Sequence, residues 1–100
     1  MIKKRIFISG KITGEDLQAS RIKFGVAETY LRTLYYDPIN PMKICEYKPD
    51  KKHSEYMKEC LRSLLTCHAI YMLKDWKFSE GATVECVVAE TIGLEMIFEK

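Results

Sequence analysis

Short continuous apolar runs alternate along the chain with longer segments in which apolar residues recur every three or four positions. The continuous runs predict buried strands at residues 5–9, 69–73 and 94–98. Residues 35–41 leave room for only a very short strand, because Pro38 and Pro41 each lack a backbone donor. Strands that alternate with helices favour a parallel sheet with right-handed crossovers, so the pattern predicts an α/β domain.

Three segments between the strands have the spacing of amphipathic helices. The first begins near residue 19, and its apolar stripe is Phe24, Ala27, Leu31 and Leu34. The second begins near residue 54, and its stripe is Met57, Leu61, Leu64 and Leu65. The third follows Ser79, a suitable N-cap, and runs to about Ile92, so that Gly93 takes the position after the helix end.

The composition is that of a single globular domain over residues 1–100. Hydrophobic residues make up 47% of the chain and charged residues 30%, which argues against disorder, and 100 residues leave no room for a second core. A net charge of +2 argues against a nucleic-acid binder. The basic residues 1–5 precede an apolar run too short for a secretion signal, and no stretch is long enough to span a bilayer. A cytoplasmic protein without membrane contact is therefore expected.

The four cysteines are expected to be free thiols. No two of them have the two-residue gap of a zinc knuckle or a redox motif; they are Cys45, Cys60, Cys67 and Cys86. Cys60 and Cys67 fit one helix face with His68 beside them, but further metal ligands at the usual spacing are missing. Neither a metal nor another cofactor is predicted.

The most informative candidate residue is Glu85. On the third predicted helix it shares a face with Gly81, Val88, Ala89 and Ile92, so a carboxylate occupies the apolar stripe. Burying an unpaired carboxylate costs roughly several kcal/mol, so a cavity, a partner or a raised pKa is expected. Gly81, one turn earlier, would let a ligand approach the backbone. An equally open interpretation is a glutamate at the edge of the stripe, bonded to a loop amide or to an arginine.

Ligands of a parallel α/β sheet bind outside the carboxyl ends of the strands. The loops that follow the first three predicted strands lie there, at residues 9–15, 40–53 and 74–81. In the first loop, Ser9, Gly10, Lys11 and Ile12 could surround a phosphate or sugar with amide donors, although a tight turn explains the loop equally well. In the second, Asn40 could offer its amide at the rim, but a turn-forming role is favoured.

The third loop contains Asp75 and Trp76, and this tryptophan either stacks on a base or packs against its own loop. The polar stretch 42–52, which contains Pro49, is expected to be an exposed loop. Its basic residues are best explained as solvated, although they would attract a phosphate; they are Lys43, Lys48, Lys51 and Lys52. His53 and His68 have no partner at a recognisable spacing, and His68 is expected to be a capping or core residue.

A set of short motifs with a particular order and spacing runs through nearly the whole chain. The motifs are Ile6–Gly14, Asn40-Pro41, Glu55–Met57, Leu64–Leu73, Trp76, Ser79, Gly81-Ala82 and Glu85. This combination resembles a short bacterial and phage branch of the nucleoside 2-deoxyribosyltransferase-like superfamily. The resemblance implies a three-layer, flavodoxin-like or Rossmann-like α/β domain, with a four-stranded parallel sheet in the order 2-1-3-4 and three main helices.

The resemblance also implies chemistry at the N-glycosidic bond of a nucleoside or nucleotide. In the characterised transferases a helix glutamate attacks the anomeric carbon, and the resulting glycosyl-enzyme passes the sugar to another base or to water. Glu85 matches that glutamate. The candidates for substrate binding are Ser9, Gly10, Lys11, Ile12, Asn40, Asp75, Trp76, Ser79 and Gly81.

The chain departs from the transferase pattern at four positions. Where the transferases carry one tyrosine and three aspartates, it has Phe7, Ser79, Cys60 and His68. The nucleophile is therefore kept, whereas the groups that would orient it and protonate the base are changed. Asp75 and Asp16 are the candidates to replace them.

Three classes of function follow. The first is a hydrolase or transferase that binds a nucleoside or nucleotide, and the second is a non-catalytic sensor or sequestering protein for nucleotides. The third is an oligomerisation module on a relic enzyme fold. Because the fold usually assembles into dimers or larger rings, we expect a homo-oligomer in which a neighbour contributes to the pocket.

Overall fold

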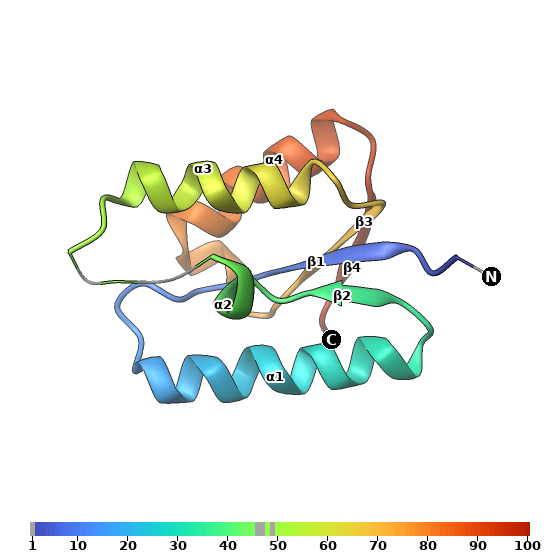
Figure 1. Cartoon of the computed structure of the whole chain (residues 1–100), viewed down its shortest axis with the longest axis horizontal. Helices are drawn as coiled ribbons and strands as arrows, with labels where there is room; N and C mark the ends of the chain where they lie inside the picture. Colours follow the sequence, from blue (N-terminus) through green and yellow to red (C-terminus); the bar gives the residue numbers. More distant parts are fainter. Residues whose placement is uncertain (1, 46–47, 49) are drawn as a thin grey trace.

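The computed structural model describes residues 2–45, 48 and 50–100 and shows a parallel sheet between two layers of helices (Figure 1). The sheet has the order β2-β1-β3-β4. Its strands are β1 (Arg5–Ser9), β2 (Asp37–Ile39), β3 (Ala69–Met72) and β4 (Glu95–Phe98). The helices are α1 (Leu17–Thr33), α2 (Pro41–Ile44), α3 (His53–Leu64), the 3-10 turn η1 (Trp76–Phe78) and α4 (Glu80–Thr91). The predicted fold class, strand order and three main helices are confirmed.

Helices cover both faces of the sheet: α1 lies on one face, and α3 and α4 lie on the other (Figure 1). The two central strands are therefore buried on both sides, and all four residues of β3 are buried. In β1, Ile6, Phe7 and Ile8 are fully inaccessible. This burial is why both strands are continuous apolar runs. Edge strand β4 is only partly covered, and it begins at Glu95, one residue later than predicted.

Helix α1 begins earlier than its apolar pattern indicates, at Leu17. Asp16 is the N-cap, and its Oδ2 accepts a 2.9 Å hydrogen bond from the backbone N–H of Ala19. The predicted stripe is buried except for Leu34, which is 46% exposed. Leu34 is the C-cap, and Tyr35 follows with a φ of 66°, so the chain turns away before Leu34 can face the core.

The prediction that residues 42–52 form only a loop is wrong in its first part, because α2 occupies Pro41–Ile44. The Asn40 side chain accepts a 2.9 Å hydrogen bond from the backbone N–H of Met42, and Pro41 takes the first helical turn. This is a strong helix start, since proline at that position loses no intrahelical hydrogen bond. Lys48 and Asp50 are exposed, as predicted, whereas Pro49 lies outside the described residues.

The buried face of helix α3 only partly matches the predicted stripe, of which Leu64 is fully buried and Met57 and Leu61 are partly buried. Its buried residues are Tyr56, Cys60 and Leu64, whereas Leu65 is 58% exposed just beyond the helix end. The predicted stripe counted only leucine and methionine as core residues. Tyrosine and cysteine are also often buried, and here they occupy the inner face of the helix.

Helix α4 has the predicted boundaries. Ser79 is the N-cap, and its Oγ accepts a 3.1 Å hydrogen bond from the backbone N–H of Ala82. Gly93 follows the C-cap with a φ of 80°, a conformation that glycine adopts without steric cost. No helix among the described residues is both long and apolar enough to cross a membrane.

Candidate functional site

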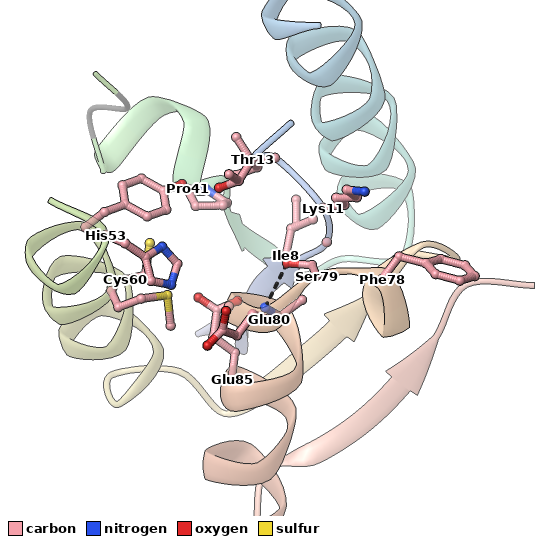
Figure 2. A pocket seen from close by; sticks show the side chains of 16 residues that line it. Ile8, Lys11, Thr13, Pro41, His53, Cys60, Phe78, Ser79, Glu80 and Glu85 are labelled. Carbon is pink, nitrogen blue, oxygen red and sulfur yellow. Dashed lines mark hydrogen bonds between the residues drawn. The ribbon is translucent and has the colours of Figure 1, made fainter. Parts of the chain in front are cut away.

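A cavity of about 490 Å³ opens at the carboxyl end of β1, where the parallel sheet predicts a ligand site (Figure 2). Three segments form its walls: the loop after β1, one face of α3, and the start of α4 with the residue before it. Pro41 of α2 adds to the lining. The volume lies within the range of small-molecule sites, which is about 300–1,000 Å³.

Glu85 lines this cavity and is only 6% exposed. Its Oε1 accepts a 2.6 Å hydrogen bond from the Ser9 hydroxyl at the end of β1. Burial raises the pKa of Glu85 to about 7, and the bond from Ser9 lowers it in part. Among the described residues, no lysine, arginine or histidine forms an ion pair with Glu85. Its polar partner is therefore the Ser9 hydroxyl, rather than the arginine or loop amide of the alternative interpretation.

Two further polar groups lie in the wall beside Glu85. Tyr56 and Cys60 project from α3, and both are almost completely buried. Burial is the largest cause that raises the pKa of Tyr56, and the negative charge of Glu85 adds to it. The neighbouring Cys45 thiol, followed by burial, raises the pKa of Cys60. Both side chains therefore keep their protons at neutral pH.

The loop after β1 is held by a contact with the loop after β3. The backbone N–H of Lys11 donates a 3.0 Å hydrogen bond to Asp75 Oδ1. Lys23 of α1 reaches both segments, with its Nζ 2.8 Å from the Lys11 carbonyl oxygen and 2.5 Å from Asp75 Oδ2. Asp75 thus shapes the loop from outside the cavity lining, whereas Gly10, Lys11 and Ile12 form the lining itself.

Three other sequence candidates also lie outside the lining, and the first of them, Ser9, reaches the site through its hydrogen bond to Glu85. Asn40 is buried, caps α2, and donates a 3.2 Å hydrogen bond from Nδ2 to Glu28 Oε1. The ring of Trp76 packs against Phe98, with 5.9 Å between the ring centroids. Asn40 therefore has the turn-forming role, whereas Trp76 packs against β4 rather than against its own loop, as the alternative had it. Ser79 and Gly81, in contrast, are part of the lining.

The basic residues described in and around the middle loop include two that pair with carboxylates. Lys43 Nζ lies 3.0 Å from Glu28 Oε2, and Lys51 Nζ lies 2.6 Å from Glu59 Oε1. His68 is exposed, so of the two roles predicted for it, capping or core, the core role is wrong. Its Nδ1 instead accepts a 3.0 Å hydrogen bond from the backbone N–H of Arg5.

The sequence did not identify several residues of the lining: Thr13, Pro41, His53, Tyr56, Met57, Phe78, Glu80 and Ala82. Four positions of α3 in the wall (residues 53, 56, 57 and 60) recur at intervals of three and four, so one helix face carries them. That periodicity was a usable signal. What local spacing could not show is that this face meets the start of α4.

The proposed replacements for the missing acids have other contacts. Asp16 caps α1, and Asp75 is paired with Lys23. Phe7 is fully buried in the sheet, and His68 lies before β3, at the opposite end of that strand from the cavity. Across the described part of the chain, no three histidine, cysteine, aspartate or glutamate side chains lie close enough together to hold a metal ion.

Comparison with known proteins assigns residues 4–98 to the family described as Domain of unknown function (DUF4406). The match covers nearly all of the chain, so the chain belongs to this family. Neither the curated proteins nor the solved structures gave a match. The family description gives no activity, so function has to be argued from the cavity.

Proposed function

We propose that this member of the DUF4406 family binds a nucleoside or nucleotide in the cavity and cleaves or transfers at its N-glycosidic bond, with Glu85 as the nucleophile. The observation that supports this most is the burial of the Glu85 carboxyl in the cavity wall with a hydroxyl, rather than a cation, as its partner. A structural role would favour a compensating positive charge. A perturbed carboxyl in a cleft is typical of a functional group.

The proposed chemistry has two steps. The Glu85 carboxylate attacks the anomeric carbon, the bond from that carbon to the base nitrogen breaks, and the base leaves with a proton. Water or a second base then attacks the glycosyl ester and releases Glu85. The Ser9 hydroxyl, at 2.6 Å, would hold the attacking carboxylate in one orientation.

The leaving base needs a proton donor, and His53 is the best placed candidate. It lines the cavity from α3 and projects toward the start of α4 (Figure 2). Its Cε1 lies 3.7 Å from the position that a Cβ on Gly81 would take, so the imidazole sits beside the mouth of the site. An imidazole can donate a proton to a departing base, which suits a general acid. This role replaces the one first assigned to Asp16 or Asp75.

The other polar groups of the lining favour a ligand with hydroxyl or phosphate oxygens. Lys11 brings a positive charge, and Thr13 brings a hydroxyl. The first turn of α4, at Glu80 and Gly81, adds backbone N–H groups that have no partner within the helix. We infer that the sugar and any phosphate lie between the loop after β1 and the start of α4.

Binding without turnover is the second candidate function. The observations that favour it are the fully buried Phe7, which has no hydroxyl, and the engagement of Asp16 and Asp75 in other contacts. A protein of this kind would sense or sequester nucleotides. The experiment below separates the two candidates.

Incubation with a panel of ribo- and deoxyribonucleosides and their monophosphates, followed by chromatography of the free base, tests the proposal. We expect base release by the wild type and its loss in Glu85→Ala. Glu90→Gln is the matched control, because Glu90 is exposed on the same helix outside the lining. A raised melting temperature without base release would favour the binding protein. Indifference to every compound would contradict both functions.

We also propose self-association, because α1 exposes an apolar stripe. Ile22, Val26 and Tyr30 follow one another at intervals of four residues and are 58%, 64% and 49% exposed. Sedimentation should show a dimer or a larger assembly that Val26→Lys weakens. Val87→Lys, at an exposed position of α4 on the other face of the sheet, should leave it intact. A monomeric wild type would contradict this proposal.

The cytoplasm is the compartment that we propose. All four cysteines are buried free thiols, as is usual for proteins of a reducing compartment.

A further inference from the structure

One face of α3 presents His53 and Met57 to the cavity as neighbours. They are four positions apart on the helix, so their side chains lie on the same face, and both line the cavity. Met57 is partly buried, as are Met42 and Leu61. Of these three, Met42 and Leu61 belong to the hydrophobic residues that pack against the buried core of the described chain. Met57 faces the cavity instead.

The Met57 side chain reaches across to the first turn of α4. Its Sδ lies 3.0 Å, and its Cε lies 3.8 Å, from the position that a Cβ on Gly81 would take. A larger residue at position 81 would have to displace this thioether. Because Gly81 has no side chain, the thioether of Met57 takes that space and forms the boundary of the cavity between the two helices.

We propose that Met57 is a specificity-determining residue: the base of the nucleoside or nucleotide packs against its thioether, and its length limits the size of the base that the cavity accepts. This inference rests on the proposed function, because it requires a ligand that carries a base. It deepens that function by assigning the base to the α3 side of the cavity and by naming the side chain that selects among bases.

The place of the base follows from the groups around the anomeric carbon. In the proposed reaction that carbon lies at the Glu85 carboxylate, and the base is one bond away from it. His53 can protonate the leaving base only if the base lies on the α3 side. His53 and Lys11 lie on opposite sides of the cavity (Figure 2), so the sugar oxygens then lie toward Lys11 and Thr13. Met57, one helical turn from His53, is therefore beside the base.

A thioether suits this contact physically. The sulfur of methionine is polarisable and makes favourable contacts with aromatic rings, and its unbranched, flexible side chain adapts to rings of different outline. The two other lining residues of α3, Tyr56 and Cys60, are almost completely buried. Met57 is thus the apolar residue of this wall whose length can change without opening the buried core.

A comparison of adenosine with ethenoadenosine, whose base carries a third ring, tests the proposal in the full-length chain. Both are used as nucleosides and as monophosphates, with ribose and with deoxyribose. Base release is followed by chromatography, binding of the etheno compound by its fluorescence, and binding of the adenosine compound by competition. The quantity compared is the ratio of ethenoadenosine to adenosine, in kcat/KM or, without turnover, in affinity.

Met57→Ala removes the thioether and opens the gap beside Gly81. We expect it to raise the ratio about tenfold or more, which is the scale of discrimination that one methylene group gives in a hydrophobic pocket. Gly81→Ala should lower the ratio, because the added Cβ pushes the thioether away from α4 and toward the cavity. Met57→Val, a smaller truncation, keeps the test available if Met57→Ala does not fold.

Met42→Ala is the matched control, since Met42 is also partly buried but packs against the core outside the lining. It should leave the ratio unchanged. An equal ratio in the wild type and the two Met57 variants, with base release or binding intact, would overturn this inference and leave the proposed function standing. A change in Met42→Ala as large as that in Met57→Ala would also overturn it. If the wild type neither binds nor cleaves any of these compounds, the inference and the proposed function both fail.

Discussion

The Ser9 hydroxyl donates a 2.6 Å hydrogen bond to Glu85, and this contact joins the end of β1 to α4 across 76 positions of the chain. It provides a buried carboxyl with a polar partner while leaving its charge uncompensated. A cation at the same place would hold Glu85 permanently ionised. With a hydroxyl, the carboxyl changes its protonation close to neutral pH, and the stability of the protein should follow that change.

Glu85 should make the protein less stable as the pH rises. The carboxyl ionises near 4.5 in the unfolded chain and near 7 in the folded one, so the folded state binds more protons between these pH values. The free energy of unfolding should therefore fall over this window, by about 3 kcal/mol for a shift from 4.5 to about 7. Urea denaturation of the wild type and of Glu85→Gln at several pH values measures it.

The glutamine variant lacks this titration, so the two stabilities should be similar near pH 4 and diverge above it. At pH 8 Glu85→Gln should equal or exceed the wild type. A loss of several kcal/mol in the variant at pH 8 would instead point to a structural ion pair, because removal of one partner leaves the other buried and unpaired.

Ser9→Ala should raise the pKa of Glu85 further, since the hydroxyl is what lowers it in the wild type. The loss of a hydrogen bond to a charged group should also cost about 1.5–3 kcal/mol above pH 8. NMR titration of the Glu85 carboxyl carbon measures the pKa. Ser20→Ala is the control, because Ser20 is equally buried and its Oγ has no partner among the described residues. An unchanged titration in Ser9→Ala would contradict the assigned contact.

Asp75 should control the loop that carries Lys11. Asp75→Ala removes the acceptor of the Lys11 N–H and the partner of Lys23, so amide hydrogen exchange at Lys11 should become faster. Asp75→Asn keeps an acceptor oxygen but loses the ion pair, and it should have the smaller effect. If the two variants exchange equally fast, the backbone hydrogen bond is not what holds the loop.

Two glycines should respond in opposite ways to substitution by alanine. A Cβ on Gly10 would lie 2.7 Å from Leu73 Cδ1, and Leu73 is fully packed, so Gly10→Ala should destabilise by about 1–3 kcal/mol. A Cβ on Gly25, inside α1, would meet nothing within 4 Å. Gly25→Ala should therefore stabilise by about 0.5–1 kcal/mol. Chemical denaturation of both variants gives the comparison, and equal effects would contradict the packing described at Gly10.

Much of the fold could be predicted from the sequence, because its elements follow local rules. The apolar run 69–73 indicated a strand buried on both faces, and Ser79 and Gly93 marked the ends of α4. Helix α2 was missed because four residues are too few for a helical period to repeat. Its only signals were the cap at Asn40 and the proline that follows.

The candidate site was less predictable, because its walls meet only through tertiary packing. Glu85 stood out as a charge on an apolar stripe, but no spacing rule links it to Ser9. In the same way, the face of α3 that carries His53 reads as an ordinary amphipathic pattern until the approach of α4 is known. The sequence indicated that Asp75 lies in the loop after β3, but its partners Lys11 and Lys23 lie far away along the chain.

The most direct test of the proposed role of Glu85 is the mass of the protein during turnover. A nucleoside from which base is released is mixed with the wild type, the reaction is quenched in acid within the first turnovers, and the digest is analysed by mass spectrometry. We predict one glycosyl unit on the α4 peptide that contains Glu85, and none on Glu85→Gln, which should also release no base. Undiminished base release by Glu85→Gln, or a glycosyl unit on another residue, would contradict the assignment of Glu85 as the nucleophile.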